Sequence, residues 1–487
     1  MTRVSTTQLR CRFAERLSSL YSVEVPAYNT LVDVSREVNE RVLRRDGATA
    51  EQLGSLARVT SERHGAIRVG TAAELGQVAR IFGALGMHPA GFYDLRDAHP
   101  LPVPVVSTAF RPLAREELAQ NPFRMFTSVL VPEDRRFFDE ELGSRLQAFL
   151  AARQLFPDEL LILADRAQEH GELAAATAER FLDLATHAFA LSSEPVDRAW
   201  YAALEQVSVV AADIGGVQTT HLNHLTPRVL DIDELHRVMT ERGIVMLDEI
   251  QGPPRWDGPD VLLRQTSFRA LAEPRTFREA DGTLRQGSLR VRFGEVEARG
   301  VALSSSGRVR YEQLVQAVDR VVVEDPGRPR SEIAAAVWNA GMPNTYRELE
   351  RQGLAQFTYR VADAVPAGAA PHTRDELIDH GWLHIEPIVY EDFLPRSAAG
   401  IFSSNLSDGA RHDDQQGGPL RDAAWLAAAI GRPLHVPEDG YAAESAASLA
   451  SVSERLGIVL QSAKEHGPSA PTPPPSPPAA TTSPRPR

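Results

Sequence analysis

Two histidines and one glutamate stand where strand side chains could share a metal ion. His64 and His224 each open a short stretch with strand character, at residues 64–70 and 224–230. Glu295 ends the stretch 289–295, on the face that also holds Leu289 and Phe293, because successive strand side chains point to opposite faces. A carboxylate on an apolar face is costly unless a cation meets it. We therefore take His64, His224 and Glu295 as candidate metal ligands.

Other interpretations of the same residue types stay open. Glu295 and Glu297 could sit on a strand end that emerges into water. His221 competes with His224 but points to the opposite face of the strand, so we expect it at the surface or beside the ligands.

Two other stretches also combine histidine with carboxylates. His384 and Glu386 share one strand face, and two aspartates follow His412. Both are alternative metal sites, although neither lies in a repeated unit.

The elements around His64 and His224 follow one plan. In each copy a helix N-cap residue follows the histidine by seven positions, at Thr71 or Asp231, and a glutamate lies three residues beyond it, as in a capping box. Each helix carries apolar residues at helical spacing and stops at a glycine. Three strand candidates then follow, at 87–95, 104–113 and 124–131 in the first copy and at 245–251, 261–271 and 288–303 in the second.

This shared order predicts a duplicated βαβββ unit. If two such units pair about a pseudo-twofold axis, their first strands meet in a shared open barrel, and His64 and His224 converge. The last strand of the first copy offers no carboxylate, which leaves two histidines and Glu295. Three ligands on one face leave coordination positions open, as in non-haem Fe(II) oxygenases. Zinc accepts the same ligands, so the ligand types leave the metal undecided.

Composition and charge limit the partners. The net charge of -13 argues against binding to nucleic acid. No apolar stretch approaches the roughly 18 residues that a membrane span needs, and the first twenty or so residues lack the apolar core of a signal peptide. The single cysteine, Cys11, suits the reducing cytosol. We expect a cytoplasmic protein without nucleic-acid or membrane partners, and the sequence leaves the oligomeric state open.

The chain of 487 residues is long enough for two to four folded modules. We expect an α+β protein with added helical regions around the two units. The expected regions are a helical N-terminal region (1–60), the first βαβββ unit (61–133), a helical insertion (134–203), the second unit (204–310), a mixed α/β region (311–465) and a disordered Pro-rich tail (466–487).

Arg68 is a candidate for binding a carboxylate. It follows His64 by four residues on the same strand face, which places the two Cα atoms about 13 Å apart at roughly 3.3 Å per residue. A guanidinium can hold a carboxylate through two parallel hydrogen bonds. The alternative is a strand-end arginine with its head group in water.

Four stretches of the chain together resemble a known family. Residues 64–70, 221–228, 292–300 and 390–395 are similar to the 2-oxoadipate dioxygenase/decarboxylase (hydroxyglutarate synthase) family of the vicinal oxygen chelate superfamily. The resemblance covers roughly residues 10–460 and implies paired βαβββ modules. It also implies that His64, His224 and Glu295 hold Fe(II) and that Arg68 binds the substrate carboxylate.

The resemblance further implies a reaction. A 2-oxo acid chelates Fe(II) beside O₂, and 2-oxoadipate becomes 2-hydroxyglutarate and CO₂, a late step of bacterial lysine breakdown. The family's substrate-contacting segment matches residues 393–402, which makes Arg396 and Ser397 candidate substrate contacts. The family has a small apolar residue in place of Arg396, so the exact 2-oxo acid stays open.

Two other functions fit the same residues. One is a zinc-dependent hydrolase or lyase that uses the same three ligands. The other is a non-catalytic protein that binds a small acid.

Overall fold

A computed structural model describes residues 2–98, 102–268, 272–289, 292–394, 412–413 and 415–460. The predictions for Arg396, Ser397 and the tail at 466–487 lie outside the described residues. The chain forms two compact units. The larger comprises residues 1–357 with 387–445, and the smaller comprises residues 358–386 with 446–487.

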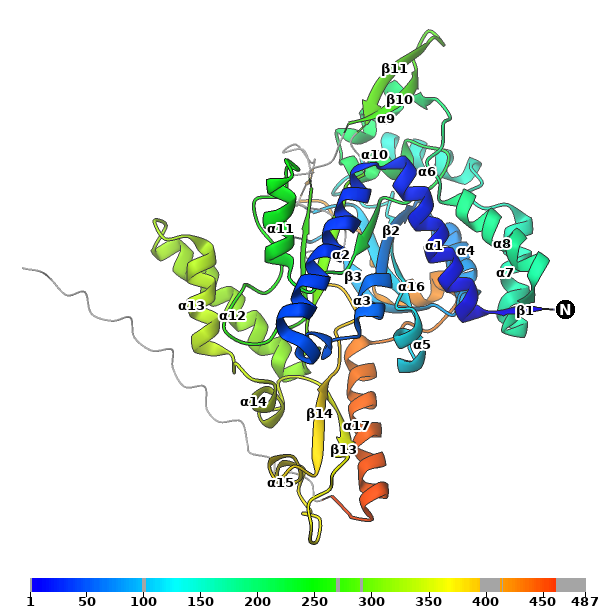
Figure 1. The fold of residues 1–487 in the computed structure, drawn as a ribbon. Coiled ribbons are helices and arrows are strands. Elements are labelled where there is room, and N and C mark those ends of the chain that lie inside the picture. Colours follow the sequence, from blue (N-terminus) through cyan, green and yellow to red (C-terminus); the bar gives the residue numbers. More distant parts are fainter. Residues whose placement is uncertain are drawn as a thin grey trace, which may run out of the picture. The chain divides into compact units, whose positions relative to one another are not determined.

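The larger unit is built around a five-stranded sheet in the order β3-β4-β5-β2-β8 (Figure 1). Its strands are β2 (Arg63–Val69), β3 (His88–Asp94), β4 (Val105–Arg111), β5 (Arg124–Leu130) and β8 (His224–Pro227). β5 runs parallel to β2, whereas β8 runs antiparallel to β2 with Ala66 opposite His224. The strands that begin at the two histidines are therefore neighbours in one sheet.

A second, two-stranded sheet lies against β8. β9 (Leu263–Ser267) pairs antiparallel with β12 (Glu295–Arg299). β12 meets the end of β8 through a parallel bridge between Arg228 and Glu297, and the Val229 amide donates to the Glu297 carbonyl at 2.8 Å. The described strands form separate sheets, not a closed barrel, and the α+β class is confirmed.

Two predicted strands of the second copy differ from the structure. Residues 245–251 form only isolated bridges, at Met246 and Gln251, because the segment carries exposed acidic residues and ends at Gly252 and two prolines. The stretch 288–303 is two elements: the end of β11 (Leu284–Leu289) and β12. β11 pairs with β10 (Glu273–Arg278), and β10 also pairs with the short β7 (Val196–Asp197).

The predicted helix caps are present in both copies. Thr71 forms a reciprocal capping box with Glu74 at the start of α4 (Ala72–Gly83). Asp231 accepts from the Glu234 amide at the start of α11 (Ile232–Glu241). These caps fix where each helix leaves its histidine strand.

Further helices surround these sheets, and α1 packs on α8 while α4 packs on α7 (Figure 1). The remaining helices of the larger unit are α1 (Thr6–Glu24), α2 (Ala27–Asp46), η1 (Gly47–Glu51), α3 (Leu56–Ser61), α5 (Arg115–Gln120), α6 (Glu140–Ala152), α7 (Asp158–His170), α8 (Ala175–Ala188), α9 (Arg198–Glu205), α10 (Val209–Gly215), α12 (Ser305–Glu324), α13 (Arg330–Gly341), α14 (Tyr346–Arg351) and α16 (Ala423–Ile430). Two three-residue strands, β1 (Arg3–Ser5) and β6 (Glu172–Ala174), pair beside α1 and α8.

The smaller unit holds most of β13 (Phe357–Val361), α15 (Arg374–Asp379), most of β14 (Leu383–Pro387) and the end of α17 (Pro437–Leu456). The Tyr359 amide donates to Ser448 Oγ, which ties β13 to α17. No helix among the described residues combines the length and apolar character that a bilayer crossing requires.

Candidate metal centre

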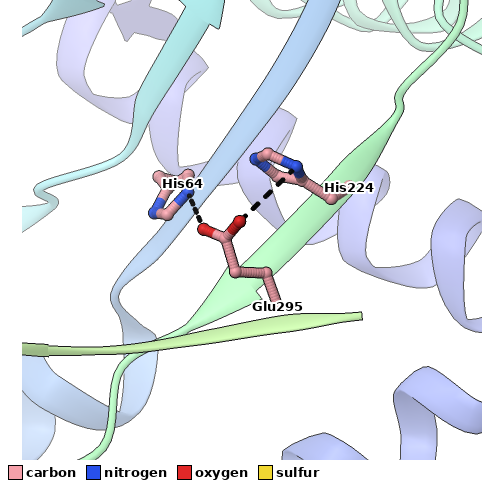
Figure 2. A group of neighbouring side chains, drawn as sticks. All are labelled: His64, His224 and Glu295. Carbon is pink, nitrogen blue, oxygen red and sulfur yellow. Dashed lines mark ion pairs between the residues drawn. The ribbon is translucent and has the colours of Figure 1, made fainter. Parts of the chain in front are cut away.

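The three predicted ligands meet in the interior of the larger unit. His64 and His224 come from the neighbouring strands β2 and β8, and Glu295 begins β12 (Figure 2). One ligand atom from each residue lies within 4.8 Å of the other two. The side chains are almost fully buried, with exposed fractions of 1%, 2% and 0% for the whole residues. Residues separated by up to 231 positions thus share one water-excluded site.

The ligand atoms fit a cation. His64 Nε2 lies 3.0 Å from Glu295 Oε1, and His224 Nδ1 lies 4.0 Å from Glu295 Oε2. Neither ring nitrogen of His224 has a hydrogen-bond partner among the described residues, and neither does Glu295 Oε2. Buried polar atoms are normally paired. A metal ion bound between the two histidines and Glu295 would satisfy these atoms.

The charge around Glu295 leads to the same conclusion. Its Oε1 accepts from Gln265 Nε2 at 2.7 Å and from Thr226 Oγ1 at 3.4 Å, both neutral groups. Burial raises the pKa of Glu295, and no described arginine or lysine pairs with it. Burial also lowers the pKa of His224 well below its ordinary value, which keeps the imidazole neutral, as a metal ligand must be.

Glu297 orients the first histidine. Its Oε2 lies 2.8 Å from His64 Nδ1, so Nδ1 faces Glu297 and Nε2 faces the site. Burial opposes ionisation of Glu297, but Arg299, His64 and Arg124 together hold its pKa well below the ordinary value. A carboxylate behind a ligand histidine fixes the tautomer and makes the imidazole a stronger donor.

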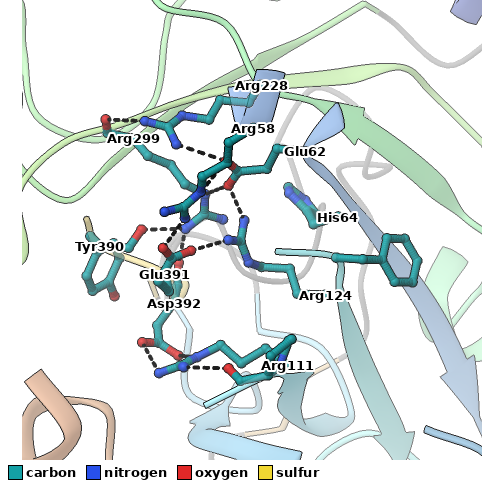
Figure 3. Close-up of polar contacts among 12 residues, drawn as sticks. Arg58, Glu62, His64, Arg111, Arg124, Arg228, Arg299, Tyr390, Glu391 and Asp392 are labelled. Carbon is teal, nitrogen blue, oxygen red and sulfur yellow. Dashed lines mark hydrogen bonds and ion pairs between the residues drawn. The ribbon is translucent and has the colours of Figure 1, made fainter. Parts of the chain in front are cut away.

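A buried cluster of arginines and glutamates lies beside His64 (Figure 3), and two of its arginines contact Glu297. Arg299 donates to both Glu297 oxygens, at 2.7 and 2.9 Å, and Arg124 approaches Glu297 at 3.3 Å. Arg124 also pairs with Glu62 at 2.8 Å and with Glu391. The cluster consists of four arginines and three glutamates: Arg58, Arg124, Arg228, Arg299, Glu62, Glu297 and Glu391.

Aromatic rings cover the histidines. The Phe393 ring meets His64 edge-on with centroids 5.0 Å apart, and the Phe293 ring lies 5.3 Å from that of His224. The two histidine rings are themselves 5.2 Å apart and nearly perpendicular. These apolar contacts restrict ring rotation and exclude water from the ligand atoms.

Arg68 does not contact the three ligands. Its Nη1 lies 2.5 Å from Asp213 Oδ2, and Asp213 also accepts from Asn223 Nδ2 at 2.8 Å. His221 Nε2 lies 3.3 Å from Asp213 Oδ1. His221 is buried, so the expected surface position was wrong, and it neighbours the ligand strand as the alternative predicted. Burial is the main cause that lowers the pKa of His221 to about 4. The charges of Arg292, Arg275 and Arg68 contribute to this shift, and the charge of Asp213 opposes it.

The structure also bears on the alternative sites, although Asp414 of the stretch at His412 lies outside the described residues. Glu295 and Glu297 are buried, so the interpretation of a solvated strand end was wrong. His384 is exposed on β14. Within the described part of the chain, His64, His224 and Glu295 are the only three His, Cys, Asp or Glu residues grouped closely enough to share an ion.

Sequence reasoning missed the supporting residues. Glu297 follows Glu295 by two positions and therefore shares its strand face, a signal that was available. Asp213 and Gln265 carried no comparable signal, because nothing in their local sequence relates them to Arg68 or Glu295.

A buried pair of histidines with one glutamate and unpaired ligand atoms is characteristic of mononuclear metalloenzymes. A model of the 2-oxoadipate dioxygenase/decarboxylase family matches residues 13–405. The chain belongs to this family, whose members are oxidative decarboxylases, and the predicted resemblance is confirmed.

Relatives match along nearly their whole length. A 2-oxoadipate dioxygenase/decarboxylase of Mycobacterium tuberculosis is 56% identical over 89% of this chain and 96% of its own length. A 2-oxoadipate dioxygenase/decarboxylase of Pseudomonas putida is 39% identical over 93% of this chain and 98% of its own length. The crystal structure of the Pseudomonas putida hydroxyglutarate synthase in complex with 2-oxoadipate superposes with a TM-score of 0.81 at 37% identity, covering 93% of this chain and 99% of that one.

Replacing Glu297 tests the orientation of His64. We predict that Glu297→Gln weakens binding of a divalent metal ion, with Fe(II) as the probe, by about 10–100-fold, because the amide holds an Nδ1 proton less strongly. Anaerobic titration of the metal-free protein measures the affinity. Glu386→Gln, on the separate strand β14, is the control and should bind as the unmodified protein does. Equal affinity for the two variants would contradict the assigned role of Glu297.

Replacing Arg124 tests the buried cluster. Arg124→Met leaves Glu62 and Glu391 short of one cation, so we predict a loss of about 3–5 kcal/mol in the free energy of unfolding. Arg242→Met breaks the surface pair with Glu37 and should cost at most about 1 kcal/mol. Chemical denaturation of both variants measures the difference, and similar losses would contradict a stabilising role for the cluster.

Proposed function

We propose that this protein is an Fe(II)-dependent dioxygenase that converts 2-oxoadipate and O₂ to 2-hydroxyglutarate and CO₂. His64, His224 and Glu295 hold the iron in this proposal. The observation that carries it is the convergence of three buried ligand atoms within 4.8 Å, in a chain of this family. The 2-oxoadipate bound to the similar Pseudomonas putida structure supports the choice of substrate.

The reaction needs no second 2-oxo acid. 2-Oxoadipate loses its C1 carboxylate as CO₂, C2 becomes the new carboxylate with one oxygen atom from O₂, and the other oxygen becomes the hydroxyl group. Atoms balance, because the C6 acid and O₂ give a C5 hydroxy acid and CO₂. Bound Fe(II) would supply the electrons that activate O₂ and the positions where O₂ and the 2-oxo acid meet.

The chain's own residues prepare this chemistry. Glu297 holds the proton on His64 Nδ1, which directs Nε2 toward the ligand set. Phe293 and Phe393 pack on the histidine rings and keep water from the ligand atoms. A dry site strengthens electrostatic interactions with a charged substrate and limits side reactions.

Arg68 binds the distal carboxylate of the substrate in this proposal. It projects from the same strand face as His64, and its side chain is largely buried beside Asp213. Arg396 and Ser397 remain proposed substrate contacts on the family motif alone.

The duplicated origin of the two units is also a proposal. The shared strand order supports it: β3-β4-β5-β2 in the first unit matches the bridged segment 245–251, β9, β12 and β8 in the second. β5 offers Phe126 toward the site where β12 offers Glu295, since the rings of Phe126 and Phe393 lie 5.1 Å apart. An aromatic ring in place of a fourth ligand agrees with a three-ligand site.

We further propose the cytosol as the place where the enzyme works, in lysine breakdown. Cys11 is free and half-buried, which suits a reducing compartment.

The direct test is O₂ consumption by protein reconstituted anaerobically with Fe(II). We predict O₂ uptake that requires 2-oxoadipate, and a 2-hydroxyglutarate product that carries both atoms of ¹⁸O₂ by mass spectrometry. Zinc-loaded protein is the control and should consume none. Absence of uptake with 2-oxo acids of five to seven carbons, or hydrolytic activity restored by zinc alone, would contradict the proposal.

Arg68→Lys tests the carboxylate assignment. Lysine keeps the charge but loses the paired donors, so we predict a KM for 2-oxoadipate raised about tenfold, with a smaller change in kcat. Arg63→Lys is a matched control, since Arg63 lies on the opposite face of β2 and donates to the Tyr28 hydroxyl. A KM change of the same size in both variants would contradict the assignment.

A further inference from the structure

A cavity lies in the larger unit, and His221, which contacts Asp213, is one of its lining residues. It has a volume of about 590 Å³ and lies between α6, the segment 192–197, the segment 216–219 and β10. That volume is within the range of small-molecule sites. Neither the three candidate ligands nor Arg68 line it.

The inner wall of this cavity carries a cation without a carboxylate partner. Arg275 is 8% exposed and donates through Nη1 to the Ser192 carbonyl, but its Nε has no hydrogen-bond partner among the described residues. Burial is the largest cause that lowers the pKa of Arg275, and Arg292 adds to it, while the charges of Glu273 and Asp213 oppose the shift without a direct ion pair. Buried guanidinium groups are normally paired, so this one lacks an anion.

The carboxylates near Arg275 already form ion pairs with other arginines. Glu273 accepts from Arg292 at 2.9 Å, and Asp213 holds Arg68 at 2.5 Å. The two acids that line the cavity itself, Glu194 and Asp197, are both exposed. No described carboxylate therefore pairs with Arg275.

Two aromatic rings among the lining residues suit an aliphatic chain. The rings of Trp200 and Phe149 line the cavity, with centroids 6.0 Å apart, and the Arg145 guanidinium lies over Trp200 at 4.4 Å. Arg145 and Arg278 add positive charge among the exposed residues of the cavity. A ligand with carboxylates joined by methylene groups matches both the cations and the apolar wall.

We propose that this cavity is a binding site for a small dicarboxylic acid, with Arg275 as its anchoring cation. The cavity is linked to Arg68 by side-chain contacts, because His221 lines the cavity and contacts Asp213, which in turn holds Arg68. The proposed role of this site is to bind the acid outside the metal centre. Only the identity of that acid as substrate or product rests on the proposed function.

Calorimetric titration of the metal-free protein with adipate tests the proposal. Adipate has the two carboxylates but no 2-oxo group, so neither metal nor turnover is involved. We expect Arg275→Gln to weaken adipate binding at least about tenfold, as loss of a charge-assisted hydrogen bond would. Arg242→Gln is the control, since Arg242 pairs with Glu37 at the surface and does not line the cavity, and it should change adipate binding less than about threefold.

Gln218→Trp gives a second approach that leaves Arg275 intact. Gln218 is an exposed lining residue, and an indole there should obstruct the cavity and weaken adipate binding to a similar extent. Thermal unfolding shows whether each variant is folded.

Three results would overturn the proposal: no adipate binding by the unmodified protein, unchanged binding by folded Arg275→Gln or Gln218→Trp, or binding lost in Arg68→Gln and kept in Arg275→Gln. The test does not use iron or O₂. Its failure would therefore leave the proposed reaction standing, and failure of the reaction would leave the site standing.

Discussion

The contact between His64 and Glu297 is the interaction on which the rest of the centre depends. An ionised carboxylate this deeply buried is unfavourable unless cations and hydrogen bonds surround it. Arg299 and Arg124 supply the cations, and their remaining donors draw Glu62 and Glu391 into the same cluster. The cluster ties β5, β12 and Glu62, the residue before β2, to the segment after β14, and so holds the start of the strand from which His64 projects.

Glu295 and Glu297 show how position decides the role of the same residue type. Both lie on one face of β12 and both are fully buried. Arginines hold the pKa of Glu297 low, whereas burial raises that of Glu295 and the neighbouring His64 offsets the effect only in part. One carboxylate is therefore neutralised by the protein, and the other is left for an external cation. The candidate ligand Glu295 and the carboxylate that orients His64, Glu297, are therefore only two residues apart on one strand.

Local patterns predicted what local sequence determines. The strands at His64 and His224, the caps at Thr71 and Asp231 and the alternation that placed Glu295 all depend on neighbours within a few positions. The arginine–glutamate cluster could not be predicted from local sequence patterns, since Arg58 and Glu391 are 333 positions apart. The β10–β11 hairpin was missed because the sequence pattern between Leu289 and Glu295 looked like one continuous strand. The pairing of Arg68 with Asp213 likewise exists only in three dimensions.

The most direct test of this account is the number of Fe(II) ions bound per chain under anaerobic conditions. We predict one Fe(II) per unmodified chain and loss of that ion in each of His64→Ala, His224→Ala and Glu295→Ala, while the variant of the exposed His384, His384→Ala, keeps it. Full Fe(II) occupancy in any of the three ligand variants would contradict the claim that these residues share one ion.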